Sequence, residues 1–80
     1  MSVYQKQMGT LIDLSSEEGY LEYHHPDAVN IPYQKFMLYY DRFLDKKKPY
    51  YLTCRKGIHS GRAVNLLEYL GYDVTQVIQS

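Results

Sequence analysis

Strand-like and helix-like patterns alternate along this chain of 80 residues, and that alternation limits the possible folds more than any other feature. Four short segments are rich in apolar, β-branched and aromatic residues and are predicted as strands: Thr10–Leu14, Ala28–Ile31, Tyr50–Thr53 and Tyr72–Ile78. Strands that alternate with helices favour right-handed crossovers and a mostly parallel sheet flanked by helices. We therefore expect an α/β fold whose functional site lies at the carboxyl ends of the strands.

The clearest helical pattern runs over residues 33–44. Its apolar residues recur at a period of 3.6 and form one stripe: Tyr33, Phe36, Met37, Tyr40, Phe43 and Leu44. A second stripe, which Gly71 ends as a C-cap, contains Ala63, Leu66, Leu67 and Leu70. The first stripe is interpreted as core, and the second predicts another amphipathic helix. A shorter helix is predicted to begin at Ser15, because Ser15 and Glu18 have the spacing of a capping box.

The length predicts one domain, residues 1–80, with one core. Nine basic residues balance nine acidic ones, which argues against a general nucleic-acid binder. No window is apolar enough to span a membrane, and the first ten residues do not resemble a signal peptide. The chain has one cysteine, Cys54, so it has no internal disulfide. These features predict a cytoplasmic location and leave the thiol free for packing or chemistry.

The balanced net charge hides two oppositely charged segments. Residues 13–45 hold seven acidic and two basic residues, a local charge of −5. Residues 46–62 hold six basic residues and no acidic one: Lys46, Lys47, Lys48, Arg55, Lys56 and Arg62. The three consecutive lysines are typical of a solvated helix end or loop. The other three basic residues surround the only thiol, so a merely solvated role is less favoured for them than for the lysines.

Cys54 directly follows a predicted strand and precedes a predicted helix. Unpaired N–H groups at such a position favour an anion, and Gly57 lets the loop curl so that amides point inward. Arg55, Lys56 and Arg62, together with a protonated His59, would add positive potential and favour the reactive thiolate. Ser60 is expected to cap the following helix. On the residues alone, a reactive cysteine and a buried, inert one both remain open.

Other chemistries fit the residues less well. His24 and His25 are adjacent and lack a usual zinc spacing with Cys54, so no metal site and no cofactor are predicted. A cysteine–histidine hydrolase built on His59 would have no orienting acid in the loop. The loop also lacks the GxxxxGK[ST] pattern of a nucleotide P-loop.

The stretch from Tyr50 to Val74, "YYLTCRKGIHSGRAVNLLEYLGYDV", resembles the active-site segment of single-domain rhodaneses. That pattern is an apolar strand, Cys-x-x-Gly-x-Arg/Ser-Ser, a helix with Ala and Leu, and Leu-x-x-x-Gly-Tyr/Phe. The matching positions are Cys54, Gly57, Ser60, Ala63, Leu67, Leu70, Gly71 and Tyr72. A second stretch, residues 11–33, is similar to the family's Ile-Asp-Val-Arg and Gly-His-Ile-Pro-Gly-Ala-Ile-Asn-Ile-Pro. Its matching positions are Ile12, Asp13, Glu18, His24, Pro26, Ala28, Asn30, Ile31 and Pro32.

The resemblance implies a small rhodanese-like three-layer α/β fold, with a mostly parallel sheet flanked by helices and a shortened C-terminus. It also implies a sulfurtransferase in which Cys54 takes sulfane sulfur from an anionic donor such as thiosulfate and becomes a persulfide. A thiol or protein acceptor would then take the sulfur. The donor-binding loop would comprise Arg55, Lys56, Gly57, Ile58, His59 and Ser60, with electrostatic support from Arg62.

Several positions depart from the family pattern. His59 stands where many members have Arg or Ser, so anion binding there would depend on pH. Ser15 replaces an Arg that often follows the aspartate of the first strand. Asp13 and His24 are expected to be structural, with His24 bonded to backbone. The family usually continues past this length through an aromatic-bearing helix. An apolar face left open by its absence would be covered by a partner or by a second copy in a homodimer.

Two other functions stay open. One is a non-catalytic rhodanese-like module for binding or regulation. The other is a phosphatase or arsenate reductase on a related fold, which uses a loop of Cys-x5-Arg. In this chain the sixth residue after Cys54 is Ser60 and Arg62 is the eighth, so the spacing speaks against that function.

Overall fold

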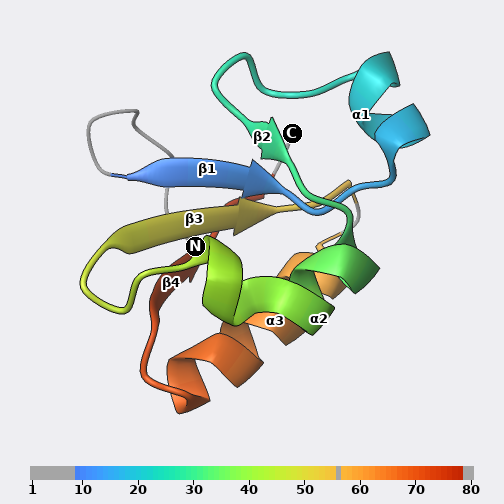
Figure 1. The fold of residues 1–80 in the computed structure, drawn as a ribbon. Helices are drawn as coiled ribbons and strands as arrows, with labels where there is room; N and C mark the ends of the chain where they lie inside the picture. The colour runs from blue at the N-terminus through green and yellow to red at the C-terminus, as the bar shows by residue number, and fades with distance from the viewer. Residues whose placement is uncertain (1–8, 56, 79–80) are drawn as a thin grey trace.

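A computed structural model of the protein describes residues 9–55 and 57–78. The elements follow in the order β1 (Thr10–Asp13), α1 (Glu17–Glu22), β2 (Val29–Asn30), α2 (Tyr33–Phe43), β3 (Pro49–Thr53), α3 (Ile58–Tyr69) and β4 (Asp73–Gln76). The four strands form one parallel sheet in the order β2-β1-β3-β4 (Figure 1). The predicted α/β architecture with a parallel sheet is confirmed.

The register of β1 and β3 brings two chain segments together at one edge. These neighbouring strands pair along their whole common length, and the last pair is Asp13 with Thr53. Because both strands run in the same direction, the residues that follow them leave the sheet side by side (Figure 1). The Leu14 N–H donates to Thr53 O at 2.8 Å and extends this pairing by one residue. The loops after β1 and β3 therefore meet.

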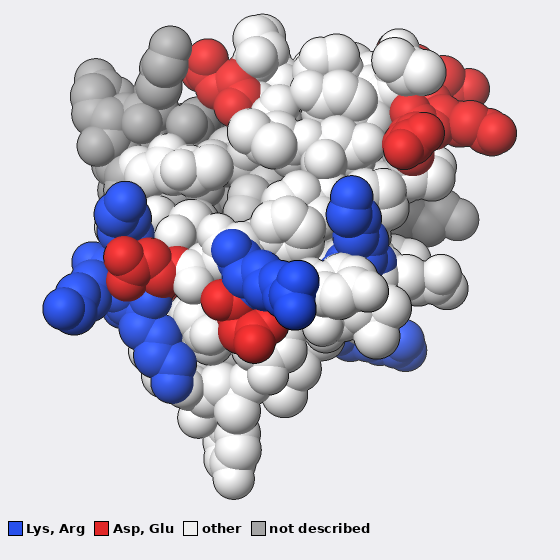
Figure 2. All heavy atoms as spheres, in the orientation of Figure 1, with Lys and Arg blue, Asp and Glu red and all other residues white. Residues whose placement is uncertain are grey.

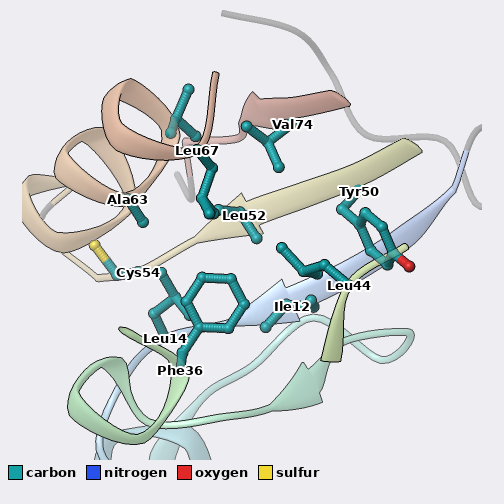
Figure 3. Packing of buried hydrophobic residues seen from close by; sticks show 11 residues of the cluster. Ile12, Leu14, Phe36, Leu44, Tyr50, Leu52, Cys54, Ala63, Leu67 and Val74 are labelled. Carbon is teal, nitrogen blue, oxygen red and sulfur yellow. The ribbon is translucent and has the colours of Figure 1, made fainter. Parts of the chain in front are cut away.

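The main core lies between the sheet and helices α2 and α3. Side chains alternate across each strand, so every second residue of β3 faces these helices. The cluster contains Ile12, Leu14, Phe36, Leu44, Tyr50, Leu52, Cys54, Ala63, Val64, Leu67 and Val74 (Figure 3). A smaller cluster on the opposite face joins Leu11, Ala28 and Tyr51, with Tyr20 of α1 packed against it. The sheet is thus covered by α2 and α3 on one face and flanked by α1 on the other.

The first helix begins one residue later than the capping box predicts. Ser16, not Ser15, is the N-cap, and its Oγ accepts the Gly19 N–H at 3.1 Å. The reason lies in Asp13, whose Oδ1 accepts the Ser15 N–H at 2.9 Å. That bond holds Ser15 in the connection from β1, so the helix starts after it.

The last helix begins earlier than predicted, and Ser60 is not its cap. Gly57 is the N-cap and adopts a left-handed conformation with φ 78°, so Ser60 lies in the first turn. The buried face of α3 consists of Ser60, Ala63, Val64 and Leu67. Leu66 belongs to the apolar stripe predicted for this helix but is 39% exposed. The face is rotated because the first turn is fixed by contacts of Ser60 with the loop before it.

The middle helix matches its prediction except near its end. Phe36 is fully buried, and Tyr33, Met37 and Tyr40 pack against the core. Phe43 was predicted to be buried but is 37% exposed. Tyr39 has non-helical backbone angles, φ −128° and ψ 23°, and this kink shifts the following turn out of the regular helical period. Gly71, with φ 96°, follows α3 as predicted.

Within the described part of the chain, no helix combines the length and apolar character needed to cross a membrane. Acidic side chains gather over α1 in the view of Figure 2, at the end of the molecule where β1 and β3 terminate.

Candidate functional site

Cys54 lies at the carboxyl end of β3, directly after Thr53. Cys54 is only 5% exposed and belongs to the main core cluster. Figure 3 shows its sulfur directed toward α3, with Ala63 on the neighbouring turn. The thiol thus lies between the carboxyl end of β3 and the start of α3, where this architecture places functional groups.

Ser60 contacts the Cys54 sulfur through both backbone and side chain. Its main-chain N–H donates to Cys54 Sγ at 3.3 Å, and its Oγ lies 3.4 Å from the same sulfur, within hydrogen-bond distance. The amides of a helix's first turn have no partner within the helix. Here one of these amides, the Ser60 N–H, donates to Cys54 Sγ. The N-terminus of α3 would therefore stabilise a negative charge on Cys54.

Gly57 makes the turn that sets this geometry. Its positive φ is a conformation that residues with a Cβ rarely adopt. Its carbonyl oxygen accepts the Gly61 N–H at 3.0 Å and the Gln76 Nε2–H at 2.8 Å, while Ser60 Oγ lies 3.3 Å away. The predicted role of Gly57 in curling the loop agrees with this arrangement.

A pocket of about 260 Å³ opens above the thiol. It is lined by Ser15, Ser16, Cys54, Arg55, Ile58 and His59. Four of these residues belong to the loop predicted from the sequence. The two serines come from the connection between β1 and α1, and the sequence reasoning missed them as pocket residues.

Arg55 points toward α1 and pairs with Glu22. Its Nη1 lies 2.9 Å from Glu22 Oε2, and both side chains are largely exposed. The sequence suggested a cation beside the thiol with no acid in the loop. The fold supplies an acid from 33 residues earlier in the chain, so part of the Arg55 charge is already balanced by a carboxylate.

His59 is exposed and its imidazole stacks on the Tyr33 ring. The ring centroids are 4.2 Å apart and the planes differ by 9°. Tyr33 itself is held by its N–H, which donates to Leu14 O at 3.1 Å. The stack fixes the imidazole at the wall of the pocket rather than leaving it free in solvent.

The remaining predicted residues occupy different positions. Ile58 lines the pocket and is 56% exposed, so it presents an apolar side chain at the entrance. Arg62 is exposed on α3 and is not among the residues that line the pocket. Lys56 lies outside the described residues.

Two residues that were predicted to be structural form hydrogen bonds with backbone groups. Asp13 is fully buried and accepts the Ser15 N–H, while its carbonyl accepts bonds from Ile31 N and Asn30 Nδ2. His24 Nδ1 lies 2.6 Å from Tyr20 O, which confirms the predicted backbone bond. In the described segments, no group of three or more His, Cys, Asp and Glu side chains is arranged to hold a metal ion.

Gln76 is a contributor that the sequence reasoning missed. It is the last residue of β4, and its Nε2 reaches both Gly57 O at 2.8 Å and Ser60 Oγ at 3.0 Å. The available signal was an amide at a position of β4 that shares a face with Val74 and so points toward the core. A polar group there needs partners, and the residues around Cys54 supply them.

A family comparison decides the classification of this fold and site. The model of the rhodanese-like domain family matches residues 2–79, nearly the whole chain. The chain belongs to the rhodanese-like domain family. Among curated proteins, none matches this rhodanese-like domain.

Solved structures agree on the fold of this rhodanese-like domain. A rhodanese-related protein from Thermoplasma volcanium superposes with a TM-score of 0.79 at 22% identity, over 92% of this chain and 72% of that one. A protein from Staphylococcus saprophyticus superposes with a TM-score of 0.78 at 21% identity, over 90% of this chain and 71% of that one. At these identities the likeness concerns the fold alone.

Proposed function

We propose that this rhodanese-like domain is a sulfurtransferase that moves sulfane sulfur through a persulfide on Cys54. The observation that carries the proposal is the position of the thiol. Its sulfur accepts the Ser60 N–H at 3.3 Å at the start of α3, beneath a pocket lined by Arg55 and His59. The amide and the helix N-terminus stabilise a negative charge on the sulfur.

In the first half-reaction, the Cys54 thiolate attacks the outer sulfur of thiosulfate. A bond forms between Sγ and that sulfur, and the sulfur–sulfur bond of thiosulfate breaks, with its electron pair leaving on sulfite. The total charge of −3 is conserved, since a persulfide anion and a sulfite dianion replace a thiolate and a thiosulfate dianion. No external oxidant or reductant is needed.

In the second half-reaction, an acceptor nucleophile attacks the terminal sulfur of the persulfide. The sulfur–sulfur bond breaks and its electron pair returns to Cys54 as a thiolate. With a thiol acceptor the product is a new persulfide, and with cyanide it is thiocyanate. Since the chain has one cysteine, the acceptor must come from another molecule. A thiol of a small molecule or of a partner protein is the acceptor class that we propose.

The pocket is consistent with a small anionic donor. Its volume of about 260 Å³ suits a molecule the size of thiosulfate more readily than a protein segment. Ile58 at the entrance would contact an apolar part of an acceptor, whereas Arg55 and His59 would favour the anionic donor.

The direct assay is thiocyanate formation from thiosulfate and cyanide, with Cys54→Ser as the matched variant. We expect turnover from the wild-type protein and none from the variant. Equal rates in the two proteins, or no thiocyanate from either with any sulfane-sulfur donor tried, would contradict the proposal.

A non-catalytic rhodanese-like module remains the second candidate, because of the Arg55–Glu22 pair and the burial of Cys54. An ion pair that already occupies Arg55 weakens the attraction for a donor, and a thiol only 5% exposed is hard for a bulky acceptor to reach. Cys54 that resists alkylation at every pH, in a folded protein, would favour this candidate over the enzyme.

A further inference from the structure

Gln76 is not among the residues that line the pocket, but its side chain contacts the active-site loop twice. It pairs with Leu52 in the parallel register of β3 and β4, so its side chain faces the same layer as the side chain of Leu52. From there its Nε2 reaches Gly57 O at 2.8 Å and Ser60 Oγ at 3.0 Å. An amide nitrogen carries two hydrogens, so these two bonds use both of them.

Three donors lie within hydrogen-bond distance of the Gly57 carbonyl oxygen. A carbonyl oxygen has two lone pairs, and here the Gly61 N–H and the Gln76 Nε2–H occupy them at 3.0 and 2.8 Å. The Ser60 hydroxyl is the third and most distant donor, at 3.3 Å. Gln76 therefore competes directly with Ser60 for this oxygen.

The Ser60 hydroxyl has one hydrogen, which must point to one acceptor. Gln76 donates to Ser60 Oγ, so the Ser60 hydrogen points away from the amide. In the neutral form the Cys54 thiol donates to Ser60 Oγ at 3.4 Å, and once that thiol has lost its proton the sulfur becomes the other acceptor within reach of the Ser60 hydrogen. A hydroxyl that donates to a sulfur anion stabilises it, because hydrogen bonds to ionised groups are stronger than neutral ones.

We propose that Gln76 is a positioning residue that directs the Ser60 hydroxyl hydrogen toward Cys54 Sγ and thereby stabilises the sulfur anion. Stabilisation of the Cys54 thiolate by this hydrogen bond requires only the geometry given above. Stabilisation of a persulfide anion rests also on the proposed sulfurtransferase function. Gln76 does not touch the sulfur; it acts through Ser60.

The test is the pH dependence of Cys54 alkylation by iodoacetamide in the full chain, where the single cysteine gives one signal. Gln76→Met keeps the side-chain length but removes both donors, so Ser60 turns to Gly57 O. The apparent thiol pKa should rise by about one to two units, the size expected for one lost hydrogen bond to a charged group. An unchanged apparent pKa in Gln76→Met would overturn the proposal.

Gln76→Glu gives a second and stronger test of the same orientation. A carboxylate cannot donate to Gly57 O or Ser60 Oγ; it accepts the Ser60 hydrogen instead and adds a negative charge. The apparent pKa should rise more than in Gln76→Met. An equal or smaller rise contradicts the orientation argument. Thr75→Val, one residue earlier in β4, is the control and should leave the value unchanged.

Gln76→Met in a Ser60→Ala background separates a positioning role from general damage to the loop. Without the hydroxyl there is nothing to orient, so Gln76→Met should add no further rise in the apparent pKa. A rise of the same size in both backgrounds would show that Gln76 acts by another route and would contradict the proposal. Circular dichroism melts of each variant verify that the measurements are made on folded protein.

The charged and titratable groups of the described residues around the thiol are not altered in these variants. They are Arg55 and His59 in the pocket, Glu22 across from Arg55, Asp13 at the end of β1, and Tyr33 against His59. Alkylation involves no sulfur donor, so its outcome is independent of sulfur transfer. A wild-type protein that forms no persulfide would refute the proposed function and leave the alkylation series valid. A wild-type Cys54 that resists alkylation at every pH would contradict the role of Gln76, because no sulfur anion would then be stabilised.

Discussion

The main-chain N–H of Ser60 lies 3.3 Å from Cys54 Sγ, although the two residues are separated by a left-handed glycine turn. The contact closes a tight loop in which the end of β3 and the start of α3 share one sulfur atom. It also couples the stability of the fold to the reactivity of Cys54, because the turn that begins α3 also places the Ser60 amide against the thiol. Substitutions that disturb either one should therefore disturb both.

Gly57→Ala should destabilise the protein by about 1–2 kcal/mol, the cost of placing a Cβ in the left-handed region. The new Cβ would also lie 3.4 Å from Gln76 Nε2. Urea unfolding followed by circular dichroism measures the change. Gly61→Ala is the matched control: Gly61 lies in α3, the helix that Gly57 caps, and a Cβ there meets only ordinary contacts of 3.5 Å or more. It should stabilise by about 0.5–1 kcal/mol through helix propensity. Equal destabilisation by both variants would contradict the role given to the turn.

Glu22→Gln should release Arg55 and strengthen donor binding. The pair is exposed, so unfolding free energy should change by less than about 1 kcal/mol. The KM for thiosulfate should fall by about twofold while kcat stays constant, because the added attraction acts on a charged ligand before the bond-breaking step. Glu17→Gln removes the same charge from the same helix and serves as the control. A KM that falls equally in both variants would mean that net charge, not the Arg55 pair, is responsible.

His59 should make donor binding depend on pH. Protonation of the imidazole adds a positive charge to the pocket wall, so thiosulfate binding should strengthen as pH falls. The measurement uses Cys54→Ser protein and isothermal titration, so that the thiol takes no part. His59→Arg in that background should bind as tightly at high pH as at low pH. If the pH dependence survives His59→Arg, it comes from another group.

The strand and helix pattern predicted the layers of this fold well, because each element has a clear period of apolar residues. The position of Cys54 after a buried strand was predicted for the same reason. What the pattern lacked was the order of the strands. Ser15 and Ser16 join the pocket because β1 lies next to β3, and nothing local in the sequence specifies that neighbour.

Long-range pairs and helix boundaries escaped prediction for related physical reasons. The Arg55–Glu22 bridge and the Gln76 bonds each join parts of the chain that only the tertiary structure brings together. Ser60 has the residue type of an N-cap, but the left-handed glycine at position 57 starts α3 before it. Val64 and Leu66 are both apolar, so period alone does not decide which of them is buried. The contact between Ser60 and Cys54 decides it.

The central claim is that Cys54 carries a sulfur atom between donor and acceptor. The most direct measurement is the intact mass of the full chain after incubation with thiosulfate, before and after addition of cyanide. We predict an adduct with the mass of one sulfur atom in the wild-type protein, removed by cyanide and absent from Cys54→Ser. No adduct in the wild-type protein, or the same adduct in Cys54→Ser, would contradict the claim.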